Sequence, residues 1–305
     1  MKKTFIAGFV IAIIGAILMG LGYTHKGNKD VTWQDGGFKV RDEKTLTKTF
    51  KDVQNLDLNT SDYVEVKNYD GSDFKVSYRD YNKVSYNAKK HQVSVTGSTG
   101  SSSIGFFFND DFNPNITIYV PKNAELNAFS GNAHGGIKIT GLKFNQLNIS
   151  SDGNVDLSSI EVKDALKLGG ESNLNLNNIQ APSLIANTNN GDINVNDSEF
   201  KSETSAISTK DGDVSIKETT LKNSKVSSSD GNIKFSQPNV IDKITATTSD
   251  GDIDASLKGR NDLSIRINTS DGTPRIFDKN TSYYDQGNRT TLYEFNSADG
   301  DVTVQ

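Results

Sequence analysis

Acidic residues that recur beside glycine are the side chains of this sequence best suited to chemistry, because carboxylates can bind cations and transfer protons. The recurring carboxylates are Asp152, Asp211, Asp230, Asp250 and Asp271. Neither a calcium-binding glycine-rich nonapeptide nor a complete EF-hand loop accompanies them. We interpret them as solvated turn residues and expect no metal site and no bound cofactor, with a bridging cation such as calcium as the alternative.

The remaining residues form no recognisable catalytic set. His25, His91 and His134 lie without triad spacing, and the phosphate-loop, dinucleotide-binding and zinc-protease motifs are absent. The chain has no Cys, which excludes disulfides, thiolate nucleophiles and Cys-ligated zinc. Carboxylates are spread so evenly that no pair stands out as a glycosidase acid and base. We predict that the protein is not an enzyme, and a polysaccharide-acting enzyme remains the alternative.

One short segment is unusually apolar for its surroundings. Its aromatic residues are Phe106, Phe107, Phe108 and Phe112, preceded by serines and interrupted by aspartates. Three consecutive Phe residues cannot all face one buried side of a strand. If they are exposed, they mark a contact with a partner or a membrane. The alternative is a loop that folds over one end of the fold as a plug.

The N-terminus has the pattern of a membrane anchor. Residues 4–23 carry no charge, and a helix that rises about 1.5 Å per residue would there span a hydrocarbon core of roughly 30 Å. The stretch is longer than the apolar region of a cleaved signal peptide and lacks an Ala-x-Ala site. Because Lys2 and Lys3 favour the inside, we predict a single-pass transmembrane helix over 1–23 in the cell membrane, with residues 24–305 outside.

Internal repetition is the strongest signal in the sequence. Apolar residues that follow Gly-Asp, Gly-Asn or a related pair occur at Ile137, Val155, Leu174, Ile193, Val214, Ile233 and Ile253, and Asp271-Gly272 follows Asp250-Gly251 by 21 residues. The steps between the apolar positions are 18, 19, 19, 21, 19 and 20 residues. A step this constant indicates one structural coil per unit, with equivalent side chains stacked on one another.

The units alternate apolar and polar residues with period two, which predicts strands with one buried face. Asp-Gly and Asn-Gly pairs supply tight turns, since glycine adopts positive φ at no steric cost. An antiparallel meander also uses such turns, but it would not require the same residues about every 20 positions. We therefore predict an all-β fold, a parallel β-solenoid resembling a β-helix, with two or three short strands in each coil of about 20 residues.

The rest of the chain is assigned around these repeats. We predict a polar tether over 24–47, wider first coils with an N-terminal cap over 48–135, and regular coils over 136–305. A terminal coil needs a cover because an open strand edge invites aggregation. The aromatic residues expected to cover the C-terminal end are Tyr283, Tyr284, Tyr293 and Phe295.

The sequence also resembles a known family. The combination consists of Ile116-Thr-Ile-Tyr-Val-Pro121, Ala124-Glu125-Leu126, the repeated Asp-Gly-Asp-Ile units and a terminal Asp-Gly-Asp-Val. It is similar to the bacterial putative-adhesin β-strand-repeat family of unknown function, common in Gram-positive bacteria, over residues 48–305. The resemblance implies a repetitive β fold that is often membrane-anchored and in some members linked to envelope stress. It supplies no catalytic residues.

Together these features predict a membrane-anchored, extracellular adhesin-like module that binds to or supports the cell envelope. The expected partners are the membrane, through the N-terminal helix, and a cell-wall polymer, a host surface or a membrane protein. Nucleic acid is not expected, because the net charge is -5 and no basic stripe is present. The alternative is an envelope stress-response regulator that contacts a membrane partner through Phe106–Phe108.

Overall fold

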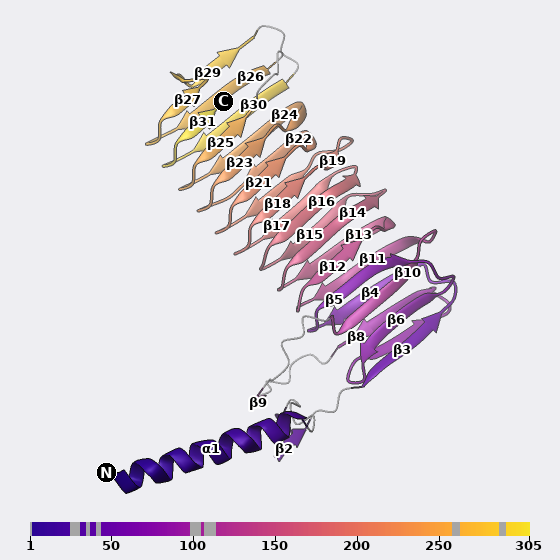
Figure 1. The fold of residues 1–305 in the computed structure, drawn as a ribbon. Helices are drawn as coiled ribbons and strands as arrows, with labels where there is room; N and C mark the ends of the chain where they lie inside the picture. The colour runs from indigo at the N-terminus through magenta and orange to yellow at the C-terminus, as the bar shows by residue number, and fades with distance from the viewer. Residues whose placement is uncertain are drawn as a thin grey trace. The chain divides into compact units, whose positions relative to one another are not determined.

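A computed structural model describes residues 2–24, 31–34, 37–40, 44–97, 105–106, 114–257, 263–286 and 291–305 (Figure 1). The chain divides into two compact units. One unit contains residues 1–44 and 100–113, and the other contains residues 45–99 and 114–305. The second unit holds the repeats.

The first unit begins with helix α1 (Lys2–Thr24), as the sequence predicts. Its predicted role as a membrane span is not supported, because no helix among the described residues combines the length and the apolar character needed to cross a bilayer.

The segment predicted as a polar tether contains β-structure. Strands β1 (Val31–Gln34) and β2 (Gly37–Val40) pair antiparallel, and β9 (Gly105–Phe106) joins the other edge of β1. Val, Phe and Trp in this segment favour strands, and the Asp35-Gly36 pair between the strands is a typical hairpin sequence. The Phe-rich segment therefore belongs to the same unit as the residues that follow α1.

The second unit is a stack of coils whose strands pair in parallel (Figure 1). The first row of stacked strands is β12 (Ile137–Thr140), β14 (Val155–Val162), β16 (Leu174–Ala181), β18 (Ile193–Asn196), β21 (Val214–Lys217), β23 (Ile233–Ser236) and β25 (Ile253–Ser256). Its register pairs Ile137, Val155, Leu174, Ile193, Val214, Ile233 and Ile253 in succession. The predicted row and the parallel stacking are confirmed residue by residue.

Two further rows complete the regular coils. The second row consists of β11 (Glu125–Ala133), β13 (Lys143–Ser151), β15 (Leu166–Gly170), β17 (Leu184–Thr188), β20 (Ala206–Thr209), β22 (Thr220–Ser227) and β24 (Asn239–Thr248). The third row is short, includes β19 (Glu199–Phe200), and buries Leu126, Phe144, Val162, Ala181, Phe200, Leu221 and Val240. Each large apolar side chain buried in these rows contributes about 1.5–3 kcal/mol.

The N-terminal end is not the simple series of wider coils that the sequence suggests. Its strands are β3 (Thr45–Phe50), β4 (Asn55–Thr60), β5 (Val64–Tyr69), β6 (Phe74–Arg79), β7 (Lys83–Asn87), β8 (Gln92–Thr96) and β10 (Ile116–Pro121). The coil of β4 and β5 pairs on one side with β11 and β12, and on the other side with β8 and β10. Three antiparallel strands close this end, because β6 pairs with β10, β3 pairs with β6, and β7 pairs with β8.

The C-terminal end uses the same device. Its strands are β26 (Leu263–Thr269), β27 (Pro274–Ile276), β28 (Lys279–Asn280), β29 (Tyr283–Asp285), β30 (Thr291–Ser297) and β31 (Val302–Val304). The last coil of the sequence, β30 with β31, lies between the β24–β25 coil and the β26–β27 coil. Strands β28 and β29 pair antiparallel with β27 and β26 and close this end.

This order corrects two expectations. The coil that starts at Asp271-Gly272 does not stack on the coil of Asp250-Gly251, because Val302 lies between Ile253 and Pro274. Tyr293 and Phe295 do not cover the end, since they are only 1% and 0% exposed inside the stack. Both coils carry the same turn motif, so the spacing along the chain does not reveal their order.

The inserted coil gives a direct test. We expect Phe295→Ala to lower the free energy of unfolding by about 3–5 kcal/mol, the usual cost of removing a buried ring. Tyr283→Ala, which changes an exposed residue of β29, should alter it by less than about 0.5 kcal/mol. Urea unfolding followed by circular dichroism measures both. Equal effects of the two substitutions would contradict the insertion.

Candidate functional site

The Asp-Gly corner, between the second and first rows, is built by close stacking of backbones. A Cβ atom added to Gly212 would lie 2.1 Å from the carbonyl oxygen of Gly191, and one added to Gly231 would lie 2.0 Å from that of Gly212. Neither glycine has φ in the left-handed region. The sequence argument from positive φ is therefore wrong at these turns. Glycine is required because the coil before it leaves no space for a side chain.

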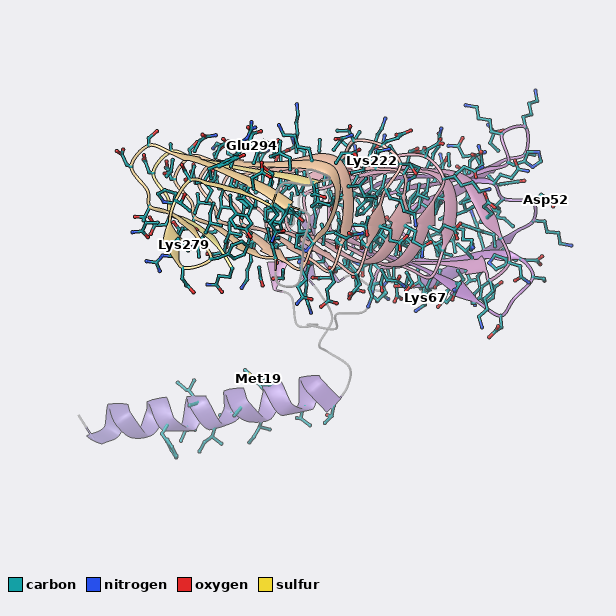
Figure 2. All side chains as sticks on the ribbon, turned by 90° about the horizontal axis from the view of Figure 1, so that it is seen from above. Met19, Asp52, Lys67, Lys222, Lys279 and Glu294 are labelled. Atoms are coloured by element: carbon teal, nitrogen blue, oxygen red, sulfur yellow. The ribbon has the colours of Figure 1, made fainter. Side chains whose placement is uncertain are left out.

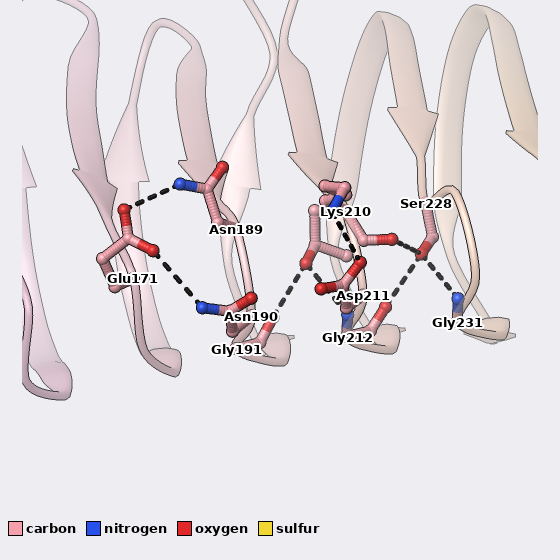
Figure 3. A network of polar contacts seen from close by, with 10 residues as sticks. Glu171, Asn189, Asn190, Gly191, Lys210, Asp211, Gly212, Ser228 and Gly231 are labelled. Atoms are coloured by element: carbon pink, nitrogen blue, oxygen red, sulfur yellow. Dashed lines mark hydrogen bonds and ion pairs between the residues drawn. The ribbon is translucent and has the colours of Figure 1, made fainter.

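A buried hydroxyl three residues before each of these glycines joins neighbouring coils. Ser228 Oγ donates to the Gly212 carbonyl at 2.9 Å and accepts from the Gly231 amide at 3.0 Å (Figure 3). The same pair of hydrogen bonds is made by Thr209, Thr248, Ser297 and Thr269. Sequence reasoning missed this role, although Ser or Thr three residues before Gly recurs visibly in the repeats.

The acidic residues of the corner fall into two classes. Those before glycine, such as Asp230 and Asp250, are exposed as predicted. Those after glycine have a structural role, because Asp213 Oδ1 accepts the backbone N–H of Asn232 at 2.7 Å and Asp252 Oδ1 accepts that of Asp301 at 2.8 Å. Within the described residues, no group of three His, Asp or Glu side chains is placed to hold a metal ion. The hydrogen bonds of Asp213 and Asp252 join each coil to the next at this corner.

A hollow forms at another corner, near the N-terminal end of the stack. The third row starts at Leu126. Among the described residues, no strand continues this row into the two coils beyond it, which are β4 with β5 and β8 with β10. The chain there turns at residues 50–53, 69–74 and 121–124, and these turns line an open hollow of about 720 Å³. Figure 2 shows Asp52, one of its lining residues, at one end of the stack and Lys279 towards the other end. We call this site the corner hollow.

The corner hollow has an apolar wall and a polar rim. Its wall contains the half-buried residues Phe50, Val53, Tyr69, Pro121 and Ala124. Its rim contains the exposed residues Lys51, Asp52, Asp70, Ser72, Lys122 and Asn123. A volume of this size lies within the range of small-ligand sites.

The aromatic side chains of the wall are held in fixed positions. Tyr69 packs edge-on against Tyr119 at 5.6 Å between ring centres, and its hydroxyl donates to the carbonyl of Asp73. A Cβ atom on Gly71 would lie 2.1 Å from the Tyr69 ring, so only glycine lets the ring lie there. Phe50 packs against Tyr86 at 5.7 Å. The wall is thus formed before any ligand arrives.

One ion pair crosses the rim. Lys122 Nζ lies 2.7 Å from Asp70 Oδ1, with the side chains 55% and 83% exposed. An exposed pair of this kind contributes little stability, about 0–1 kcal/mol. Lys51 is the other cation among the lining residues, which also include Asp52 and Asp73. No nucleophile lies among these lining residues beside a histidine that could act as its base.

The Phe-rich candidate is only partly placed by the structure. Phe107, Phe108 and Phe112 lie outside the described residues. Phe106 lies in β9, where its backbone pairs with Val31 of β1. The corner hollow, in contrast, was missed by sequence reasoning because its lining comes from three turns that are distant in the chain. Tyr69-Asp70-Gly71-Ser72 and Pro121-Lys122-Asn123 signal turns in the sequence, but turns alone do not reveal a common hollow.

Comparison with known proteins identifies the family. The profile of the Toastrack DUF4097 family matches residues 53–305. The chain belongs to this Toastrack family. The match agrees with the resemblance seen in the sequence over residues 48–305 and with the stacked β-coils. A search of curated proteins finds no match.

Solved bacterial structures are also similar over most of the chain. A putative adhesin from Parabacteroides merdae is 16% identical, with 86% of this chain and 96% of that chain covered and a TM-score of 0.48. A putative lipid binding protein from Parabacteroides distasonis is 16% identical, with 86% and 97% covered and a TM-score of 0.48. A putative adhesin from Bacteroides fragilis is 13% identical, with 87% and 98% covered and a TM-score of 0.39. Identity this low transfers no residue roles, so the chemistry of the site rests on this chain alone.

The second class of corner aspartate can be tested by a matched pair of variants. Asp213→Asn keeps an oxygen that accepts the Asn232 amide, and Asn already occupies the equivalent positions 173 and 232. We expect it to unfold like the wild type. Asp213→Ala removes the acceptor and should lower the free energy of unfolding by about 1 kcal/mol. Urea midpoints measure the difference, and equal losses in both variants would show that charge rather than hydrogen bonding matters.

Proposed function

We propose that this Toastrack-family protein is an adhesin-like binding module of the cell envelope and that its ligand occupies the corner hollow. The observation that carries the proposal is the hollow itself, with its preformed aromatic wall and its rim supplied by three turns. Concave sites with apolar walls and a few convergent polar groups are the usual places where proteins bind small ligands. The stack acts as a rigid scaffold that holds the three turns in place.

The proposal is of binding without catalysis. The carboxylates of the rim are exposed, and Asp70 is paired with Lys122. A glycosidase instead needs one carboxyl group kept protonated beside a second, ionised one. Sustained release of reducing ends from cell-wall polysaccharide by the purified protein would contradict this part of the proposal.

Location at the cell membrane, with residues 24–305 outside, remains a prediction from the uncharged residues 4–23 and from Lys2 and Lys3. Protease added to intact cells should then degrade the repeats. Protection of the repeats until the cells are lysed would exclude this location.

A second candidate is a regulatory contact with a membrane partner. It is favoured by β9, which brings the backbone of Phe106 beside Val31, shortly after α1. Replacing Phe106, Phe107 and Phe108 together with Ser should then abolish crosslinking to a membrane protein in intact cells. The circular dichroism spectrum should stay unchanged, since the repeats form a separate compact unit. Unchanged crosslinking would leave the corner hollow as the better candidate.

The corner hollow can be tested by filling it. Ser72 is exposed on its rim, so Ser72→Trp should block the hollow without removing a packing contact. We expect at least a tenfold weaker association with isolated cell-wall material, measured by co-sedimentation. Asn187→Trp places the same bulk on an exposed position of the second row and should bind normally. Loss of binding in Asn187→Trp alone would move the site to the face of the stack.

A further inference from the structure

The chemistry of the corner hollow narrows the class of ligand, and this inference rests on the function proposed above. Its lining carries both hydrogen-bond donors and acceptors at short range. Lys51 and Lys122 donate, Asp52 and Asp70 accept, and Ser72 can do both. A hydroxyl group also donates and accepts, so a ligand with several hydroxyl groups can pair with all three turns at once.

The charges of the hollow disfavour an anionic ligand. Its two lysines face three carboxylates, those of Asp52, Asp70 and Asp73. Lys122 is already paired with Asp70 at 2.7 Å. A phosphate or an acidic peptide would therefore meet more negative than positive groups, at a cost that rises as water is excluded. A cationic ligand gains little, because the rim carries lysines on two of the three turns.

The wall favours a ligand with an apolar face. Phe50 and Tyr69 are half-buried, and both line the hollow. An aromatic ring carries negative charge on its face and attracts weakly positive C–H groups. The axial C–H groups of a sugar ring form such a face, while its hydroxyl groups point outward to the rim.

The lining also argues against an extended peptide. Peptides bind commonly by adding a strand to a free sheet edge. The hollow is lined by turns and by the ends of strands β3, β5, β6 and β10 rather than along a strand. We propose that the corner hollow binds an uncharged oligosaccharide, with a sugar ring against Tyr69 and its hydroxyl groups on the rim.

The test uses the full chain and four defined probes. The probes are the trimers of N-acetylglucosamine, β-1,4-linked glucose and α-1,4-linked glucose, with inorganic phosphate as the anionic comparison. We expect at least one trisaccharide to bind saturably in calorimetry and phosphate not to compete. Binding should weaken about tenfold or more in Tyr69→Ala, and about tenfold in Asn123→Ala, which loses one hydrogen bond to a sugar hydroxyl group.

Two controls keep the test decisive. Asn123 is exposed on the rim, so Asn123→Ala should fold normally even if Tyr69→Ala does not. Asn187→Ala, on the outer face of the second row, should bind the trisaccharide like the wild type. The proposal is overturned if no trisaccharide binds, or if binding is equal in Asn123→Ala and the wild type.

The outcomes also separate the ligand class from the proposed function. If no trisaccharide binds but Ser72→Trp still abolishes association with cell-wall material, the hollow remains a binding site and the ligand is of another class. If Ser72→Trp has no effect on that association, the hollow is not the site and the proposed function fails with the inference.

Discussion

The close approach of successive backbones at the Asp-Gly corner is the constraint on which the stack depends. A Cβ atom added to Gly300 would lie 2.0 Å from the carbonyl oxygen of Gly251. Each coil can therefore stack in only one register at this corner. In that register the Ser228 hydroxyl bonds to both Gly212 and Gly231. The Asp213 carboxylate accepts the backbone N–H of Asn232 in the next coil. The three apolar rows follow the same step, which is why aliphatic side chains of similar size recur so regularly.

The two ends solve a problem that this stacking creates. A parallel stack exposes a strand edge at each end, and such edges invite aggregation. At each end the coil nearest that terminus of the repeats, β4–β5 or β30–β31, lies between an outer coil and the rest of the stack, and antiparallel strands are added outside. Among the described residues, no strand of the outer coils at the N-terminal end continues the third row, and the turns at residues 50–53, 69–74 and 121–124 line the corner hollow there. The corner hollow is a consequence of how this end is closed.

The sequence predicts the regular part of the fold well and the ends poorly. Ile137 to Ile253 could be aligned because stacking demands the same residue type at the same step. Val302 could not be placed, since its motif matches that of Pro274 and a repeat does not encode the order of its coils. Tyr69 and Pro121 could not be brought together, because their pairing depends on the order of the coils. The hydroxyl of Ser228 was visible in the sequence but has no role until coils are stacked.

The most direct measurement of the stacking constraint is the stability of Gly231→Ala beside Gly169→Ala. A Cβ atom at position 169 would meet only the Asn187 oxygen at 3.9 Å, whereas at 231 it would overlap the Gly212 carbonyl. Gly231→Ala should therefore lower the free energy of unfolding by about 1–3 kcal/mol, and Gly169→Ala should leave it unchanged or raise it by up to about 1 kcal/mol. A stabilisation of about 0.4–1 kcal/mol by Gly231→Ala, as expected for an unstacked turn, would contradict the account.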